Sequence, residues 1–154
     1  MDKTDTFPAN KISLSTLAVD GVIYGVAAGV AMFLSLVALA LLSGEAPGVI
    51  PSRFSGAGIT SPILGLLGHL GVSAIYGVLF GVLIWPVLRR FSSRKISGVF
   101  GGILYAGLLV LLAQIAILPG TNSPLNQFPF WQWALGHGVY GLVLGGLFAR
   151  KQPE

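Results

Sequence analysis

The sequence contains no cysteine and little charge. Without cysteine, the chain has no disulfide bond, no thiolate nucleophile and no cysteine-bound metal or iron–sulfur site. Charged residues make up 9% of its 154 residues, whereas soluble domains average about 25%, and the mean hydropathy is +0.84. This composition excludes an ordinary soluble globular protein and predicts an integral membrane protein.

Four long apolar runs are present, and most of the charges lie between them. The runs cover residues 17–42, 63–88, 98–118 and 130–148. Each is close to or above the roughly 20 residues that a helix needs to cross the hydrocarbon core of a bilayer. We therefore expect an all-α integral membrane protein, a four-transmembrane-helix bundle that forms a single membrane domain over residues 1–154, because little chain is left for a soluble module.

The basic residues indicate the orientation of these helices. Eight of the nine fall on one side of the four predicted spans, namely Lys3, Lys11, Arg89, Arg90, Arg94, Lys95, Arg150 and Lys151. Basic residues beside short spans mark the cytoplasmic side of a membrane. Both termini are therefore expected in the cytoplasm, and only Arg53 is placed on the outer side.

Small residues recur at steps of four along each run. The stripes comprise Gly21, Gly25, Gly29, Gly65, Gly77, Gly81, Gly98, Gly102, Ala106, Gly141 and Gly145. Residues four apart share a helix face, and small side chains on that face let helix backbones approach closely within a bilayer. The stripes therefore predict glycine-rich helix contacts in a tight bundle.

A tyrosine precedes a small residue in every run, at Tyr24, Tyr76, Tyr105 and Tyr140. A unit of two helices returns the chain to its starting side, so a duplicated two-helix hairpin would place two parallel repeats in the membrane. Glycine-rich apolar helices also resemble one another by composition alone. The pattern therefore fits both a true duplication and a coincidence of composition.

Three polar residues inside the runs, His69, Gln114 and His137, are the candidate cofactor-binding residues. At about 1.5 Å of rise per residue, all three lie about 8–12 Å below the outer boundary, in one layer. Polar groups are costly in hydrocarbon, so they should face the bundle interior and form hydrogen bonds. Two histidines at matched depth are typical of axial ligands to haem or another tetrapyrrole. The alternative is a structural role, with each histidine hydrogen-bonded to a facing Gln, Ser or Tyr or to a backbone carbonyl.

Other kinds of site lack the residues that they need. Two histidines and one glutamine are a poor ligand set for a metal, and the only acid near a span is Asp20, at the inner end of the first run. Ser73 lies one turn from His69, but no further acid or oxyanion arrangement accompanies it. No basic and aromatic surface indicates nucleic-acid binding. We therefore expect no metal site, no enzyme activity and no nucleic-acid partner.

The second half of the chain carries a series of short motifs. These are Gly68-His69, Gly98 and Gly102, Pro119-Gly120, Pro129, Gly136-His137 and Arg150. Over roughly residues 68–150 this series resembles the YagU-like family of small bacterial inner-membrane proteins. The family has an acidic residue one turn before the second Gly-His pair, where this chain has Trp133. The resemblance implies a bacterial cytoplasmic-membrane protein with two intramembrane histidines and a loose link to acid stress.

Three functions are compatible with these features. The first is a non-catalytic accessory or scaffold subunit, whose partners are the lipid bilayer and either other membrane-protein subunits or further copies of itself. The second is a haem-binding or proton-responsive membrane protein built around His69 and His137, with Gln114 as their partner. The third is a small facilitator or channel, for which a narrow glycine-lined interior offers no obvious hydrated path.

Overall fold

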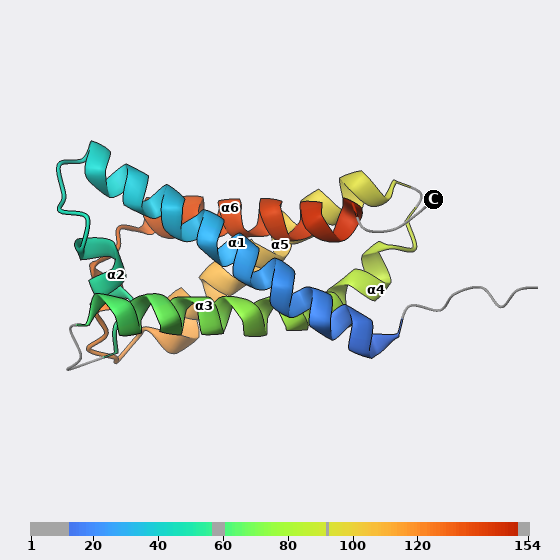
Figure 1. The fold of residues 1–154 in the computed structure, drawn as a ribbon, viewed down its shortest axis with the longest axis horizontal. Helices are drawn as coiled ribbons and strands as arrows, with labels where there is room; N and C mark the ends of the chain where they lie inside the picture. The colour runs from blue at the N-terminus through green and yellow to red at the C-terminus, as the bar shows by residue number, and fades with distance from the viewer. Residues whose placement is uncertain (1–12, 57–60, 92, 151–154) are drawn as a thin grey trace, which may run out of the picture.

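The computed structural model describes residues 13–56, 61–91 and 93–150, and within these ranges the chain is helical with no strand (Figure 1). The main helices are α1 (Leu14–Leu42), α3 (Pro62–Leu79), α5 (Arg94–Leu112) and α6 (Phe130–Arg150). The shorter elements are α2 (Val49–Arg53), the π-helical η1 (Phe80–Ile84), α4 (Trp85–Leu88), the π-helical η2 (Ala113–Ile117) and the 3₁₀ turn η3 (Pro124–Gln127). The helical runs therefore lie close to the four predicted ranges.

Serine caps mark the starts of α1 and α3. The Ser13 hydroxyl accepts a hydrogen bond from the Thr16 amide at the start of α1, and Ser61 accepts one from the Leu64 amide at the start of α3. Such caps satisfy amides that have no partner inside the helix. Gly44, with φ 79°, follows the end of α1, where a left-handed residue reverses the chain.

Three helical segments are long and apolar enough to cross a membrane by length and composition. They are Leu14–Leu42, Pro62–Leu88 and Arg94–Ile117. α6 is not among them, because Gln132, His137 and its glycines and tryptophans lower its hydropathy. Both of those polar side chains are buried, Gln132 at 3% exposure and His137 at 8%.

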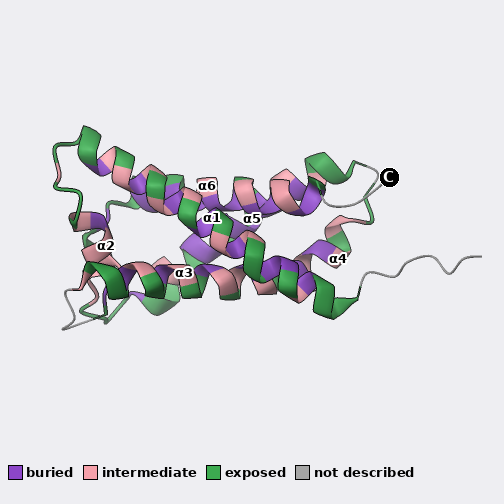
Figure 2. Cartoon of the chain, viewed as in Figure 1, coloured by how far each residue is buried: buried purple, intermediate pink, exposed green. Residues whose placement is uncertain are grey.

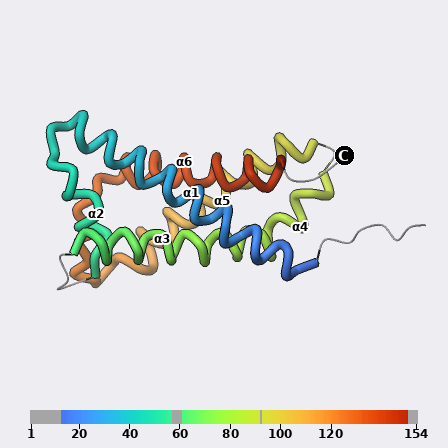
Figure 3. Tube along the Cα trace, viewed as in Figure 1, coloured from blue at the N-terminus to red at the C-terminus, as the bar shows by residue number. Residues whose placement is uncertain are grey.

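Glycines bring the helices into two close pairs. α1 crosses α3 (Figure 3). Gly21 and Gly25 face Gly77 at this crossing, and a Cβ at Gly21 would lie 2.6 Å from the Gly77 carbonyl oxygen. α5 packs on α6 in the same way, where a Cβ at Gly102 would collide with the Gly141 carbonyl oxygen. α1 and α3 form the first hairpin, and α5 and α6 form the second. α1 also packs on α6 and so joins the two hairpins. The pairing follows the two-helix unit of the predicted repeat.

The remaining stripe residues are all buried, and most lie at the same two contacts. Those at helix-pair contacts are Gly29 and Gly81 in the first hairpin and Gly98, Ala106 and Gly145 in the second. Gly65 differs from the prediction, because a Cβ there would collide with the Pro51 carbonyl oxygen. Gly65 therefore makes room for α2 and not for a second long helix.

The outward faces of the helices are apolar. Leu34 on α1, Ile75 on α3 and Leu108 on α5 are each about 60% exposed, at 59%, 60% and 61%. Buried residues instead face the centre of the bundle along each helix (Figure 2). A helix surface of this kind suits a hydrocarbon environment, in which the exterior need not be polar.

The two ends of the bundle differ in charge. The start of α1, the α4–α5 connection and the end of α6 lie together at one end (Figure 1). That end, the basic end of the bundle, carries Arg89, Arg90, Arg94, Lys95 and Arg150. The other end holds α2 and η3, with Arg53 as the basic residue of α2. Lys3, Lys11 and Lys151 lie outside the described residues.

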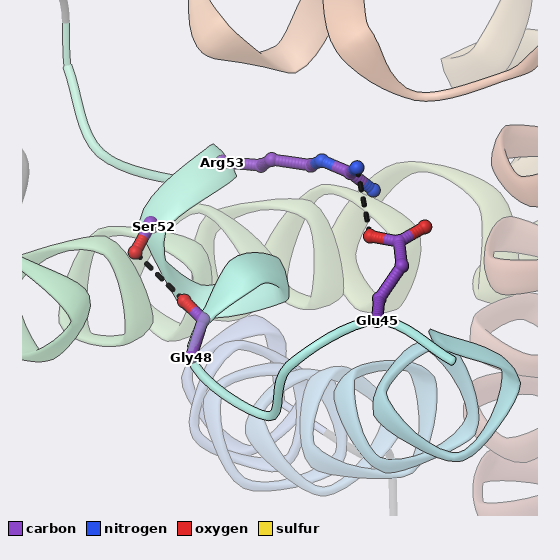
Figure 4. Close-up of polar contacts among 4 residues, drawn as sticks. All are labelled: Glu45, Gly48, Ser52 and Arg53. Atoms are coloured by element: carbon purple, nitrogen blue, oxygen red, sulfur yellow. Dashed lines mark hydrogen bonds and ion pairs between the residues drawn. The ribbon is translucent and has the colours of Figure 1, made fainter. Parts of the chain in front are cut away.

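The segment between the first two long helices contains the short helix α2. Ser52 Oγ donates to the Gly48 carbonyl oxygen at 2.7 Å, and Arg53 forms an ion pair with Glu45 at 2.8 Å (Figure 4). The Arg53 guanidinium also lies over the Phe128 ring, 5.2 Å from its centroid. The contact between Arg53 and Phe128 holds α2 across the end of the bundle, and local sequence does not indicate this tertiary contact.

The π-helical turns also lie outside what the sequence pattern predicts, and each precedes a proline. η1 ends just before Pro86, and η2 ends just before Pro119. At η2 the Leu118 amide donates to the Ala113 carbonyl oxygen at 2.8 Å, a five-residue step. A proline removes one helical donor, and a wider turn before it changes which carbonyl each remaining amide reaches. The turn also rotates the residues that follow it.

Candidate functional site

A cavity of about 240 Å³ lies near the α2 end of the bundle. It is lined by Met32, Phe54, Gly68, His69, Val72, Ser73, Tyr76, Leu109, Ala113, Ile117, Leu118, Leu125, Trp133, His137 and Tyr140. These residues come from both hairpins and from the segments that close this end. The cavity therefore lies between the two hairpins and contains both histidines of the chain.

His69 is held in the cavity wall by contacts on two sides. Its Nε2–H donates to the Gly29 carbonyl oxygen of α1 at 3.0 Å. The Phe54 ring, just past α2, packs on the imidazole with the ring centroids 4.3 Å apart. Because a ring nitrogen facing a carbonyl must carry the proton, Nδ1 of His69 keeps a lone pair.

His137 is held within its own helix. Its Nδ1–H donates to the Trp133 carbonyl oxygen, four residues earlier, at 3.0 Å. The imidazole stacks on the Trp133 indole, with centroids 5.2 Å apart and an interplanar angle of 22°. Nε2 of His137 therefore keeps its lone pair, and this nitrogen and Nδ1 of His69 form no hydrogen bond to the described residues. Neither nitrogen is fully enclosed by protein atoms, so both are accessible to a ligand.

Gln114 does not join the two histidines. It lies in η2, where its neighbours Ala113 and Ile117 line the cavity and it does not. Its side chain forms no hydrogen bond to any residue in the described part of the chain. The structure therefore brings His69 and His137 together in one cavity and leaves Gln114 out of it. The face of this helix that lines the cavity carries Leu109, Ala113 and Ile117, and Gln114 lies on the adjacent face.

Tyrosines of the second hairpin fix it to α3. The Tyr140 hydroxyl donates to the Ser73 carbonyl oxygen at 2.8 Å, and the Tyr105 hydroxyl donates to the Tyr76 carbonyl oxygen at 2.9 Å. Tyr76 also lines the cavity, and its own hydroxyl has no hydrogen-bond partner among the described residues. The wall therefore offers one free hydroxyl donor beside two imidazole lone pairs.

Trp133 is a site residue that the sequence pattern did not single out. It lines the cavity at 9% exposure, and its Nε1–H is enclosed without a partner. Its place four residues before His137, on the same helix face, was the available signal.

The cavity is open to the side of the bundle and closed toward the basic end. Val72 and Ile117 line it while remaining 47% and 49% exposed, and the exposed Gly68 lies on the same edge. α3 and α5 do not pack closely on each other. Toward the basic end the bundle is filled by Phe80 and Trp85, both fully buried. The opening is thus lateral, between α3 and α5.

The cavity is uncharged and small. No Asp, Glu, Lys or Arg lines it, and the described residues hold no group of three or more His, Cys, Asp or Glu suited to a metal ion. Drug-sized ligands occupy pockets of about 300–1,000 Å³, so a cavity of about 240 Å³ favours a smaller molecule than a tetrapyrrole.

No family model, curated protein or solved structure matches this chain. The resemblance to the YagU-like family stays a prediction.

Proposed function

We propose that this chain is a non-catalytic, four-span membrane protein that binds a small lipophilic molecule from the bilayer. Both termini and the α4–α5 connection then face the cytoplasm, as the positive-inside rule requires of the basic end. The observation that supports this proposal is the cavity itself. It is uncharged, contains both buried histidines and opens sideways between apolar helix faces.

The geometry of α6 supports its place as the fourth span. Its 21 residues extend over about 31 Å at 1.5 Å per residue, the thickness of a hydrocarbon core. Its polar side chains Gln132 and His137 are turned into the bundle, while Leu135 and Leu142 are exposed. A helix whose polar groups are enclosed by its neighbours crosses a bilayer at a lower mean hydropathy than an isolated one.

The cavity supports binding over catalysis. Ser73, the hydroxyl closest in sequence to His69, donates to the His69 carbonyl oxygen at 2.8 Å and does not pair with the imidazole. No carboxylate lines the wall to orient a histidine as a base. The groups present accept and donate hydrogen bonds, which is sufficient to recognise a neutral ligand.

The other predicted functions receive less support. The glycine stripes pack against each other inside the chain, so they leave no stripe free to hold a partner subunit in an accessory or scaffold role. A facilitator or channel would need a path through the basic end, where Phe80 and Trp85 fill the interior. A haem would need a larger cavity.

A bulky side chain at the lateral opening of the cavity is expected to keep the lipophilic ligand out. Gly68 lines the cavity edge and Gly71 does not, and a Cβ at either position would have no neighbour within 4 Å. We expect Gly68→Phe to fill the opening and Gly71→Phe to leave it free, with little effect on packing from either. The measurement is mass spectrometry of solvent extracts from protein purified in mild detergent.

Wild type and Gly71→Phe should carry one lipophilic species near one molecule per chain, and Gly68→Phe should carry much less of it, because its side chain would occupy the opening. Equal amounts in the two variants, or no species above a detergent blank, would overturn the proposed function.

A further inference from the structure

We propose that the ligand is a neutral, hydroxylated ring lipid of the quinol class, whose two ring hydroxyls donate to Nδ1 of His69 and Nε2 of His137. This inference rests on the proposed function and names the chemistry of its ligand. It is carried by the charge, the shape and the hydrogen-bonding groups of the cavity.

The lack of charge restricts the headgroup. None of the lining residues is acidic or basic. A buried ion without a counter-charge is strongly disfavoured, so phosphate, carboxylate and ammonium headgroups do not suit this site. The lipophilic molecules that remain are neutral ones.

The shape of the wall favours a flat ring. Phe54, Trp133, Tyr76 and Tyr140 all contribute aromatic side chains to the lining. Aromatic side chains stack on flat rings or meet them edge to face. The volume of about 240 Å³ suits a single substituted ring. A long alkyl tail would extend through the lateral opening beside Val72 and Ile117 into the surrounding lipid.

The hydrogen-bonding groups favour a ring with two hydroxyls. Each histidine uses its one N–H on a backbone carbonyl, Gly29 for His69 and Trp133 for His137. The two remaining nitrogens can only accept, so the ligand must supply two donors. A quinol has two O–H groups on one ring, whereas a sterol has one and a hydrocarbon has none. The Tyr76 hydroxyl is free to donate to an oxygen of the same ring.

The test is equilibrium binding of tritiated decylubiquinol, kept reduced, to the full-length protein in mild detergent. Decylbenzene is the matched probe, because it has the same tail and no oxygen. We expect one decylubiquinol per chain, bound about tenfold more tightly than decylbenzene, as one or two hydrogen bonds to a buried acceptor allow.

His137→Phe keeps an aromatic ring against Trp133 and removes the acceptor. We expect it to weaken decylubiquinol binding about five- to tenfold and leave decylbenzene binding unchanged, which also shows that the cavity has folded. His69→Phe should do the same. Trp131→Phe, half-exposed at 50% and outside the cavity lining, is the control and should bind both probes as wild type does.

Equal affinity of the wild type for the two probes would overturn the quinol assignment and leave the proposed function standing. Unchanged decylubiquinol affinity in both histidine variants would also overturn it. If neither probe binds saturably, both the assignment and the proposed function fail.

Discussion

Gly77→Leu is expected to separate α1 from α3 and to destabilise the bundle by about 3 kcal/mol or more, at or above the usual range for overpacked cores. A Cβ at Gly77 would collide with the Gly21 carbonyl oxygen and lie 2.6 Å from the Gly25 Cα. Both obstacles are backbone atoms, so no side-chain rotation can relieve the clash. The measurement is unfolding in mild detergent, followed by circular dichroism against temperature and added SDS.

Gly107→Leu is the matched control for this variant. Gly107 lies in the second half of α5 on an exposed face, and a Cβ there has no neighbour within 4 Å. Leucine should stabilise the helix at this position by about 0.5–1 kcal/mol, because it has the higher helix propensity. Similar unfolding curves for Gly77→Leu and Gly107→Leu would show that the α1–α3 contact is not what holds the bundle together.

Single cysteines are expected to label from opposite sides of the membrane. The chain has no native cysteine, so each introduced thiol reports on one position. Asn122 is exposed before α6 at the α2 end, and Ser93 is exposed at the basic end. Asn122→Cys should react with a membrane-impermeant maleimide on intact cells at least about tenfold more than Ser93→Cys, because the proposed orientation places the basic end in the cytoplasm.

A cysteine appended after Glu154 tests α6 itself. If α6 spans the membrane, this thiol should stay protected on intact cells, as in Ser93→Cys, and react once the membrane is permeabilised. Labelling of the appended cysteine together with Asn122→Cys would mean that α6 does not cross. The protein would then have three spans.

The small-residue stripes could be predicted because helix period and residue size are local properties of the sequence. Gly25 and Gly77 fall on inward faces for that reason, and both are buried in the α1–α3 contact. Gly136 was not predicted as a packing residue, although a Cβ there would lie 3.2 Å from the Met32 side chain. Its packing depends on how α6 lies on α1, which no single helix pattern specifies.

The candidate site could be predicted only in part. His69 and His137 were predicted to lie at the same depth, and they line one cavity. Depth can be predicted because it follows directly from counting residues along straight helices. Depth alone did not place Gln114, because depth does not specify which face of a helix lines the cavity, and that face carries Leu109, Ala113 and Ile117. Phe54 reaches His69 only because α2 folds back over the end of the bundle, a tertiary contact that the pattern of a single helix does not specify.

Quenching of Trp133 fluorescence by lipids brominated on their acyl chains tests the central claim, a cavity between the hairpins that opens to the bilayer. Each single-tryptophan protein keeps one of the three tryptophans and carries phenylalanine at the other two. Trp133, although only 9% exposed, should be quenched through the lateral opening. Trp85, fully buried at the basic end, should not be.

Adding Gly68→Phe should reduce the quenching of Trp133 and leave that of the half-exposed Trp131 unchanged, because brominated acyl chains quench only a tryptophan that they can contact. If Trp133 is as protected as Trp85, or if Gly68→Phe has no effect on it, the cavity is not open to the bilayer and the account is wrong.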